Sequence, residues 1–171
     1  MVDRGNPKAS AFFIGEAPGA NEDLEGKAFV GRSGRLLDSL LAEIGFDTNQ
    51  DALIANVVKC RPPDNRRPEP EEAKTCLPFL KKQIELVNPR LILLLGATAL
   101  KYFTTQKKTA PMSEQVGRFF TQADTPGIAW MVIYHPAFIL RDPRKKDLMR
   151  EHLGIFVREW KKIKKEAEAH V

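Results

Sequence analysis

The apolar stretch Ala11-Phe-Phe-Ile14, which runs directly into Gly15-Glu-Ala-Pro-Gly19, decides the fold class. A short apolar run that ends at a glycine- and proline-bounded loop is typical of a parallel strand buried on both faces. Three further runs share this character, at 52–58, 91–95 and 130–134. The segments between them have helical spacing, so the alternation predicts a three-layer α/β sandwich with a mainly parallel four-stranded sheet.

Apolar residues at helical spacing predict the covering helices. Ser33 can cap the first helix and Gly45 can stop it. The second begins at Pro70, and Pro78 inside it is expected to kink or split it, because proline removes a donor and clashes with the preceding turn. The two remaining helices are expected over 97–103 and from about 144 to 165.

The composition indicates one globular domain over 1–171. The 171 residues suffice for a hydrophobic core, and 43% hydrophobic with 29% charged residues excludes disordered and fibrous classes. The longest apolar run, 91–100, is shorter than the roughly 20 residues of a bilayer span, so no membrane partner is expected. Without a secretory pattern the protein is expected to be cytoplasmic, and without a surplus apolar stripe a monomer.

The charge balance is basic. Lys and Arg number 27 against 22 Asp and Glu, for a net charge of +5, which favours a polyanionic partner such as nucleic acid. The most biased stretch is 61–70, which contains several prolines and arginines and is expected to be an irregular loop. Taken alone, its arginines would be read as solvated surface residues.

Polar residues follow three of the four strands: Glu16, Asn56 and His135. Because ligands of open α/β sheets bind beyond the carboxyl ends of the strands, these side chains are expected to meet in one crevice. The glycines of the 15–19 loop also allow a plain turn or a phosphate loop. The loop lacks the lysine of a P-loop and the third glycine of a dinucleotide fingerprint, which disfavours a nucleotide-dependent hydrolase.

Each of these residues has a structural and a functional interpretation. Asn56 can be a satisfied turn residue, or its amide can accept from uracil N3–H and donate to O4, an order that cytosine reverses. His135 precedes a proline, which favours extended backbone, and it can be structural or act as a donor or acid/base group. Phe29 can be a core residue or a face on which a flipped base stacks.

Four motifs together resemble the signature of family 4 uracil-DNA glycosylases. They are Gly15-Glu-Ala-Pro-Gly19 with Glu22-Asp23, Gly26-x-x-Phe29-Val-Gly31, Asn56-Val-Val-Lys-Cys-Arg-Pro-Pro63 with Asn65-Arg66, and His135-Pro-Ala137. The motifs occur in the same order as in that family and at compatible spacing, and the resemblance extends from about residue 5 to 160. The resemblance implies the fold of these enzymes and a role in DNA base-excision repair.

The resemblance further implies a monofunctional enzyme that flips uracil out of DNA, hydrolyses its N-glycosidic bond and leaves an abasic site. Phe29 would stack on the base and Asn56 would read its polar edge, while Glu16 and the backbone of Ala17 would line the pocket. His135 would donate to uracil O2 as charge develops on the departing base.

The carboxylate that assists catalysis is expected to be Glu22. A related family carries its carboxylate where this chain has Ala17, so Asp23 and Glu16 remain alternatives. The resemblance also implies that arginines contact DNA. Phosphates would meet Arg61, Arg66 and Arg67, and the gap left by the flipped base would be filled by Arg141 or by Leu140.

Cys60 and Cys76 resemble the second pair of ligands of the [4Fe–4S] cluster of this family. The first pair, a Cys-x-x-Cys upstream of Gly5-Asn-Pro7, is not in the sequence, so two of four ligands are present. We expect a start downstream of the true one, rather than a lost cluster, and no stable cluster in the chain as given. A non-catalytic DNA-binding module of the same fold is the alternative function.

Overall fold

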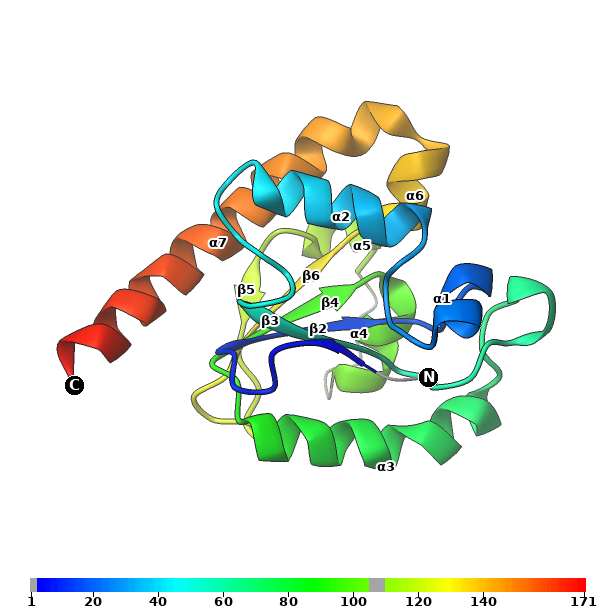
Figure 1. The fold of residues 1–171 in the computed structure, drawn as a ribbon, viewed down its shortest axis with the longest axis horizontal. Coiled ribbons are helices and arrows are strands. Elements are labelled where there is room, and N and C mark those ends of the chain that lie inside the picture. The colour runs from blue at the N-terminus through cyan, green and yellow to red at the C-terminus, as the bar shows by residue number, and fades with distance from the viewer. Residues whose placement is uncertain (1–2, 105–109) are drawn as a thin grey trace.

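The computed structural model describes residues 3–104 and 110–171. Its core is a six-stranded sheet in the order β1-β3-β2-β4-β6-β5 (Figure 1). The four central strands are parallel, and they are the four that the apolar runs predict. Their bounds are β2 (Ala11–Gly15), β3 (Ala52–Asn56), β4 (Leu91–Leu95) and β6 (Ala129–Ile133).

The two edge strands are antiparallel and were not predicted. β1 (Arg4–Gly5) pairs with β3, and β5 (Phe119–Phe120) pairs with β6. Each is two residues long, which is too short to display the alternation by which strands are recognised in a sequence. The prediction of a mainly parallel α/β sheet is therefore confirmed, with six strands in place of four.

Helices cover both faces of the sheet, giving the three layers (Figure 1). On one face lie α2 (Arg32–Ala42), α6 (Pro136–Arg141) and α7 (Lys146–Ala169), and on the other lie α3 (Pro70–Val87) and α4 (Ala97–Phe103). Short helices occur at α1 (Ala20–Glu25) and α5 (Met112–Gln115), and 3₁₀ turns at η1 (Pro63–Asn65) and η2 (Pro143–Lys145).

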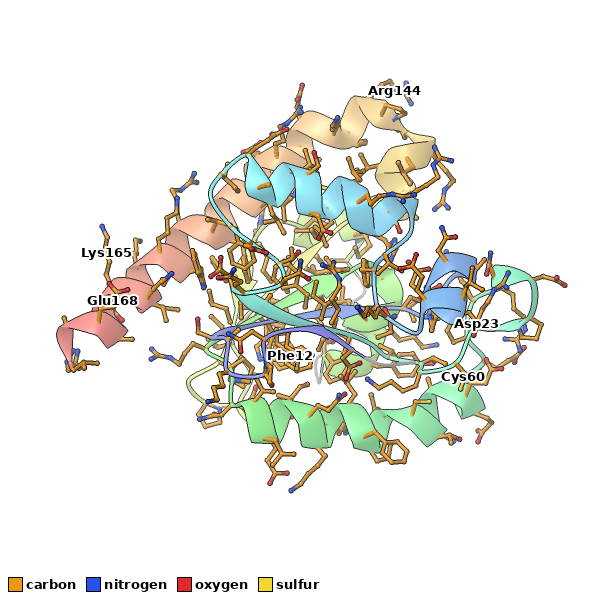
Figure 2. The ribbon with its side chains drawn as sticks, viewed as in Figure 1. Phe12, Asp23, Cys60, Arg144, Lys165 and Glu168 are labelled. Carbon is orange, nitrogen blue, oxygen red and sulfur yellow. The ribbon has the colours of Figure 1, made fainter. Side chains whose placement is uncertain are left out.

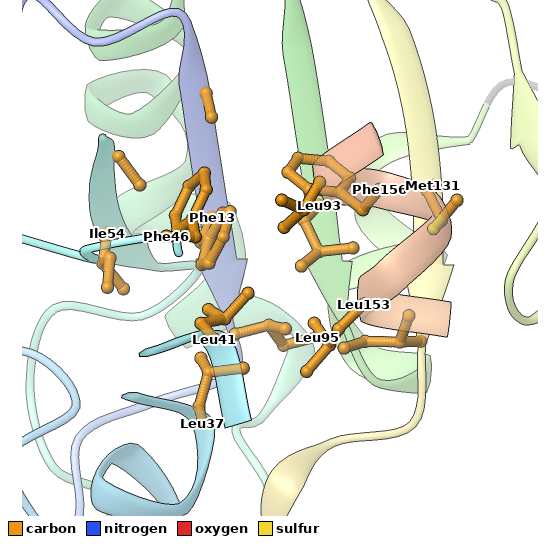
Figure 3. Packing of buried hydrophobic residues seen from close by; sticks show 14 of the residues in the cluster. Phe13, Leu37, Leu41, Phe46, Ile54, Leu93, Leu95, Met131, Leu153 and Phe156 are labelled. Atoms are coloured by element: carbon orange, nitrogen blue, oxygen red, sulfur yellow. The ribbon is translucent and has the colours of Figure 1, made fainter. Parts of the chain in front are cut away.

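The strands divide their side chains between two hydrophobic clusters, as the period of two requires. Phe12 of β2 points toward α3 (Figure 2), where it is buried with Leu80. Its neighbour Phe13 points the other way and packs on Phe46 and Phe156, with ring centroids 5.6 Å apart in both pairs (Figure 3). The central strands are buried along almost their whole length, which explains their continuous apolar sequence.

Two details of the helices differ from the predictions. Ser33 lies within the first turn of α2, whose N-cap is Gly31. A kink or a split was expected at Pro78, and the helix does not split there, because α3 is one helix. The ring of Pro78 lies on the exposed side of that helix, as does Lys74 one turn earlier, so water can solvate the carbonyl that loses its donor. None of the described helices is long and apolar enough to cross a membrane.

Candidate active site

One pocket of about 590 Å³ lies at the carboxyl ends of the parallel strands. The loops that follow β2, β4 and β6 and the last residue of β3 all contribute to its wall, as the strand-end argument predicts. Most of the predicted site residues line it: Glu16, Ala17, Glu22, Phe29, Asn56, Arg66, His135 and Arg141. Arg61, Cys60 and Cys76 are not among the residues of its wall.

Asn56 ends β3 and is 1% exposed. Neither its amide oxygen nor its amide nitrogen has a hydrogen-bond partner among the described residues. A buried polar atom without a partner costs about 1–3 kcal/mol, so an amide of this kind is explained by a ligand that both donates and accepts. Asn56 therefore gives the pocket one unpaired donor group and one unpaired acceptor.

Gly15 allows the floor of the pocket to close. A Cβ atom at this position would lie 2.4 Å from Oδ1 of Asn56 and 2.5 Å from the ring of Phe29. Because such distances are far inside van der Waals contact, only glycine lets the amide and the ring approach the end of β2 together. The backbone approach that glycine permits is thus made to the protein's own side chains rather than to a phosphate.

Phe29 adopts a left-handed backbone conformation with φ of +56°. A bulky residue in this region carries about 1–3 kcal/mol of strain, which persists only where the surroundings determine it. The carbonyl of Phe29 rests against Gly34, where a Cβ atom would come within 1.9 Å of it. Phe29 is 5% exposed, and its ring lies 5.8 Å from the imidazole of His135, centroid to centroid.

His135 caps helix α6 from an extended backbone, as its position before Pro136 predicts. Its Nδ1 atom accepts a hydrogen bond from the backbone N–H of Ala137 at 3.0 Å. Burial lowers the pKa of this imidazole, and the charge of Glu16 opposes the shift only in part. His135 is therefore neutral at pH 7 and carries its proton on Nε2.

Glu22 joins two loops at the rim. The residue is 8% exposed, and its carboxylate accepts from the backbone N–H of Gly31 at 2.8 Å and of Gly19 at 3.1 Å. These two glycines are the N-caps of α2 and α1, so one carboxylate neutralises both helix N-termini. Each oxygen retains a further lone pair, which leaves the charge able to act on a ligand.

Thr98 is a pocket residue that sequence reasoning missed. It lies in the first turn of α4, and its hydroxyl donates to Oε2 of Glu16. The turn before it contains Gly96 at φ of +95°, packed against the Cβ atom of His135. The Gly-Ala-Thr sequence directly after an apolar strand is the signal that could have indicated it.

The arginines of the 61–70 loop differ in their surroundings. Arg66 donates to both carboxylate oxygens of Glu72, at 2.9 and 2.8 Å, and this pairing holds the pKa of Glu72 down at about 2. Arg61 donates to Oδ1 of Asn65 at 2.7 Å, away from the pocket wall. Arg67 and Arg141 line the pocket and are exposed.

Cys60 and Cys76 lie close to one another in the fold. The backbone N–H of Lys59 donates to the sulfur of Cys76 at 3.5 Å, and Cys60 is exposed at the same end of the molecule as Asp23 (Figure 2). Within residues 3–104 and 110–171 no three potential metal ligands cluster. A four-thiolate cluster therefore does not fit the ligands that this chain supplies, since two cysteines are all that it contains.

The fold and the pocket have counterparts among known proteins. The family model described as the uracil DNA glycosylase superfamily matches residues 2–161. A type-4 uracil-DNA glycosylase from Saccharolobus solfataricus is 42% identical over 86% of this chain and 69% of its own length. Those from Thermotoga maritima and Archaeoglobus fulgidus are 44% and 40% identical, over 88% and 84% of this chain and 76% and 73% of their own lengths. The chain belongs to the type-4 uracil-DNA glycosylase family.

Proposed function

We propose that this protein excises uracil from DNA by hydrolysis of the N-glycosidic bond. The observation that carries the proposal is the unpartnered, buried amide of Asn56 in a pocket that also contains a neutral histidine and an aromatic ring. The relatives at about 40% identity are named as enzymes of this activity, which supports it.

Recognition of the base combines stacking with edge reading. The flipped uracil stacks on Phe29 while the amide of Asn56 accepts from N3–H and donates to O4. Cytosine presents an acceptor at N3 and a donor at N4, so it leaves buried polar atoms unpaired, at about 1–3 kcal/mol each. The backbone of Ala17 and the carboxylate of Glu16 complete the wall around the base.

Catalysis follows from the tautomer of His135. The C1′–N1 bond breaks with both electrons moving to the base, and the negative charge spreads to O2. Nε2–H donates to O2, and this hydrogen bond strengthens as the charge develops, so it stabilises the transition state more than the bound substrate. Water adds to C1′ of the sugar, and its proton is released to solvent or to the departing base.

The sugar becomes cationic as the base leaves, and a fixed carboxylate stabilises it. We assign this role to Glu22, whose charge is held in place by the two backbone N–H groups of Gly19 and Gly31. Glu16, held by Thr98, is the nearest alternative. Asp23 is exposed and is not part of the pocket wall, which disfavours it.

DNA binding and the cofactor complete the proposal. Arg61, Arg66 and Arg141 contact the duplex, with Arg141 beside the flipped base and Arg66 presented by its ion pair with Glu72. The protein acts as a cytoplasmic monomer. A [4Fe–4S] cluster would need two thiolates beyond those of Cys60 and Cys76, so no step of the reaction is assigned to it.

The test is an oligonucleotide assay. A duplex with a single deoxyuridine is incubated with the protein and treated with alkali, which cleaves at abasic sites. A duplex with thymidine at the same position is the control. Strand cleavage confined to the uracil duplex is expected. If no cleavage occurs, the proposed enzymatic activity is contradicted, and the alternative of a non-catalytic DNA-binding module is favoured. The His135→Ala variant shows whether cleavage depends on the pocket described above.

A further inference from the structure

We propose that Arg4, on the edge strand β1, is a positioning residue for uracil binding. Its guanidinium holds the backbone on both sides of Phe29 and thereby fixes the ring on which the base stacks. The inference rests on the proposed function, because it concerns the same pocket.

The guanidinium of Arg4 donates through all five of its N–H groups. Two of the acceptors are backbone carbonyl oxygens, of Ala28 at 2.9 Å and of Phe29 at 3.3 Å. The other three are side-chain oxygens, of Asp38 at 2.9 Å, Thr48 at 3.1 Å and Asn49 at 2.8 Å. The Arg4 side chain is 10% exposed, and all of these bonds except the exposed one to Asn49 are partly buried, so those four meet less competition from water.

The two backbone contacts bracket the strained residue. The carbonyl group of Ala28 lies on the N-terminal side of the Phe29 Cα atom, and the carbonyl group of Phe29 itself lies on the C-terminal side. Between them, φ of Phe29 is +56°. A phenylalanine prefers the extended or right-handed regions, and rotation toward either would turn these oxygens away from one shared donor. Arg4 therefore opposes the relaxation that would move the ring of Phe29 away from Gly15 and Asn56.

Arg4 is itself fixed from two sides. β1 pairs with β3 in the register Arg4–Ile54, and Asn56 ends that same strand. Thr48 donates at 2.7 Å to the Asp38 oxygen that also accepts from Arg4, which closes a partly buried network. The stacking ring and the reading amide are thus positioned by one strand pair, and the site depends on a residue outside the pocket wall.

The planar fork of arginine is required for this task. Its five N–H groups point in fixed directions, whereas a lysine ammonium offers three donors around one point and cannot span carbonyls and carboxylate together. Arg4→Lys therefore keeps a positive charge beside Asp38 and loses the bracket around Phe29.

The experiment compares Arg4→Met with Arg150→Met. Arg150 makes an ion pair of similar length, to Glu43 at 3.1 Å, but its side chain is more exposed and takes no part in the pocket wall, so it controls for the loss of an arginine charge. Two quantities are measured at a temperature where circular dichroism shows folded protein: the inhibition constant of free uracil, and the affinity for DNA with an abasic site, which has no base to stack on Phe29.

Arg4→Met is expected to raise the inhibition constant of uracil about tenfold, because a misplaced Phe29 ring loses part of the stacking energy of one base. The affinity for abasic DNA is expected to be unchanged. Arg150→Met is expected to change neither. In a Phe29→Leu background, Arg4→Met is expected to have no further effect, because Arg4 acts through that ring. An unchanged inhibition constant in Arg4→Met, or effects that multiply with Phe29→Leu, overturns the proposal.

Arg4→Lys is the second variant if Arg4→Met does not fold. It is expected to raise the inhibition constant in the same direction, and an unchanged value in a folded Arg4→Lys protein overturns the role of Arg4. The same measurements distinguish a failure of the proposed uracil excision from a failure of the proposed role of Arg4. A wild-type protein that excises no uracil contradicts both proposals, whereas wild-type excision with a wild-type inhibition constant in the Arg4 variants contradicts this one alone.

Discussion

The hydrogen bond from the backbone N–H of Ala137 to Nδ1 of His135, 3.0 Å long, decides what this histidine can do. With Nδ1 acting as an acceptor, the neutral ring has its single proton on Nε2 and is a donor there. The same contact caps α6, so the secondary structure and the tautomer are determined together. A donor that is uncharged in the ground state gains most of its strength when the departing base becomes anionic.

His135→Ala is expected to lower the rate of uracil excision by about 100- to 1,000-fold, the usual effect of removing one donor to a developing anion. Binding of the uracil duplex is expected to change far less, because the hydrogen bond is weak before charge develops. Single-turnover kinetics and a binding isotherm measured on an uncleaved substrate separate the two. Equal losses in rate and affinity would remove His135 from transition-state stabilisation.

Excision is expected to be independent of pH around neutrality and to fall only in acid. The pKa of His135 is lowered by burial, so the neutral donor persists below the ordinary histidine value of about 6.5. The unfolded chain then binds more protons than the folded one, so stability contributed by this group is present above the unfolded pKa and is lost as pH falls. A pH–rate profile of the wild-type enzyme checks this, and a decline centred at or above the ordinary value contradicts it.

Asn56→Asp is expected to reduce discrimination between uracil and cytosine, because an acceptor replaces the amide donor that faces O4. The measurement is the ratio of excision rates on duplexes with deoxyuridine and deoxycytidine at one position. Asn88→Asp is the matched control, since Asn88 is exposed at the end of α3. An unchanged ratio in a folded Asn56→Asp protein would exclude the amide from base readout.

Gly15→Ala is expected to abolish most activity while the protein still folds. The new methyl group would lie 2.4–2.5 Å from the Asn56 amide and the Phe29 ring, so one or both must leave their positions. Gly154→Ala in α7 is the control, because its nearest contact is 3.5 Å away and alanine favours a helix by about 1 kcal/mol. Wild-type excision by Gly15→Ala would show that the pocket floor tolerates displacement.

Glu22→Gln and Glu16→Gln distinguish the two carboxylates. Glutamine at position 22 places an NH₂ group against one of two backbone N–H donors, so a loss of about 1–3 kcal/mol in unfolding free energy is expected together with slower excision. Glutamine at position 16 can keep the hydrogen bond from Thr98. Rates corrected for the folded fraction are compared, and a larger loss in Glu16→Gln would transfer the role to Glu16.

The sequence predicts the central sheet well, because four apolar runs describe strands buried on both faces. It also predicts which side chains meet, since parallel strands present their carboxyl ends at one edge. The edge strand that contains Arg4 could not be predicted, because a strand of two residues is too short to show an alternation of apolar and polar residues. The left-handed conformation of Phe29 could not be predicted, because it is accompanied by a close approach to Gly34 and by a hydrogen bond from Arg4, 25 residues away in the chain. The bond of Glu22 to the backbone N–H of Gly31 could not be predicted either, because it depends on how the intervening loop folds.

The order of the strands along the chain determines when each part of the pocket is synthesised. Glu16 follows the second strand in the chain and His135 follows the last parallel strand, and β4 separates these two strands in the sheet. Phe29 and Asn56 are therefore synthesised well before His135, the residue that we propose donates to the departing base. Chains that stop before β6 lack Tyr134 and His135, and with them one side of the pocket wall.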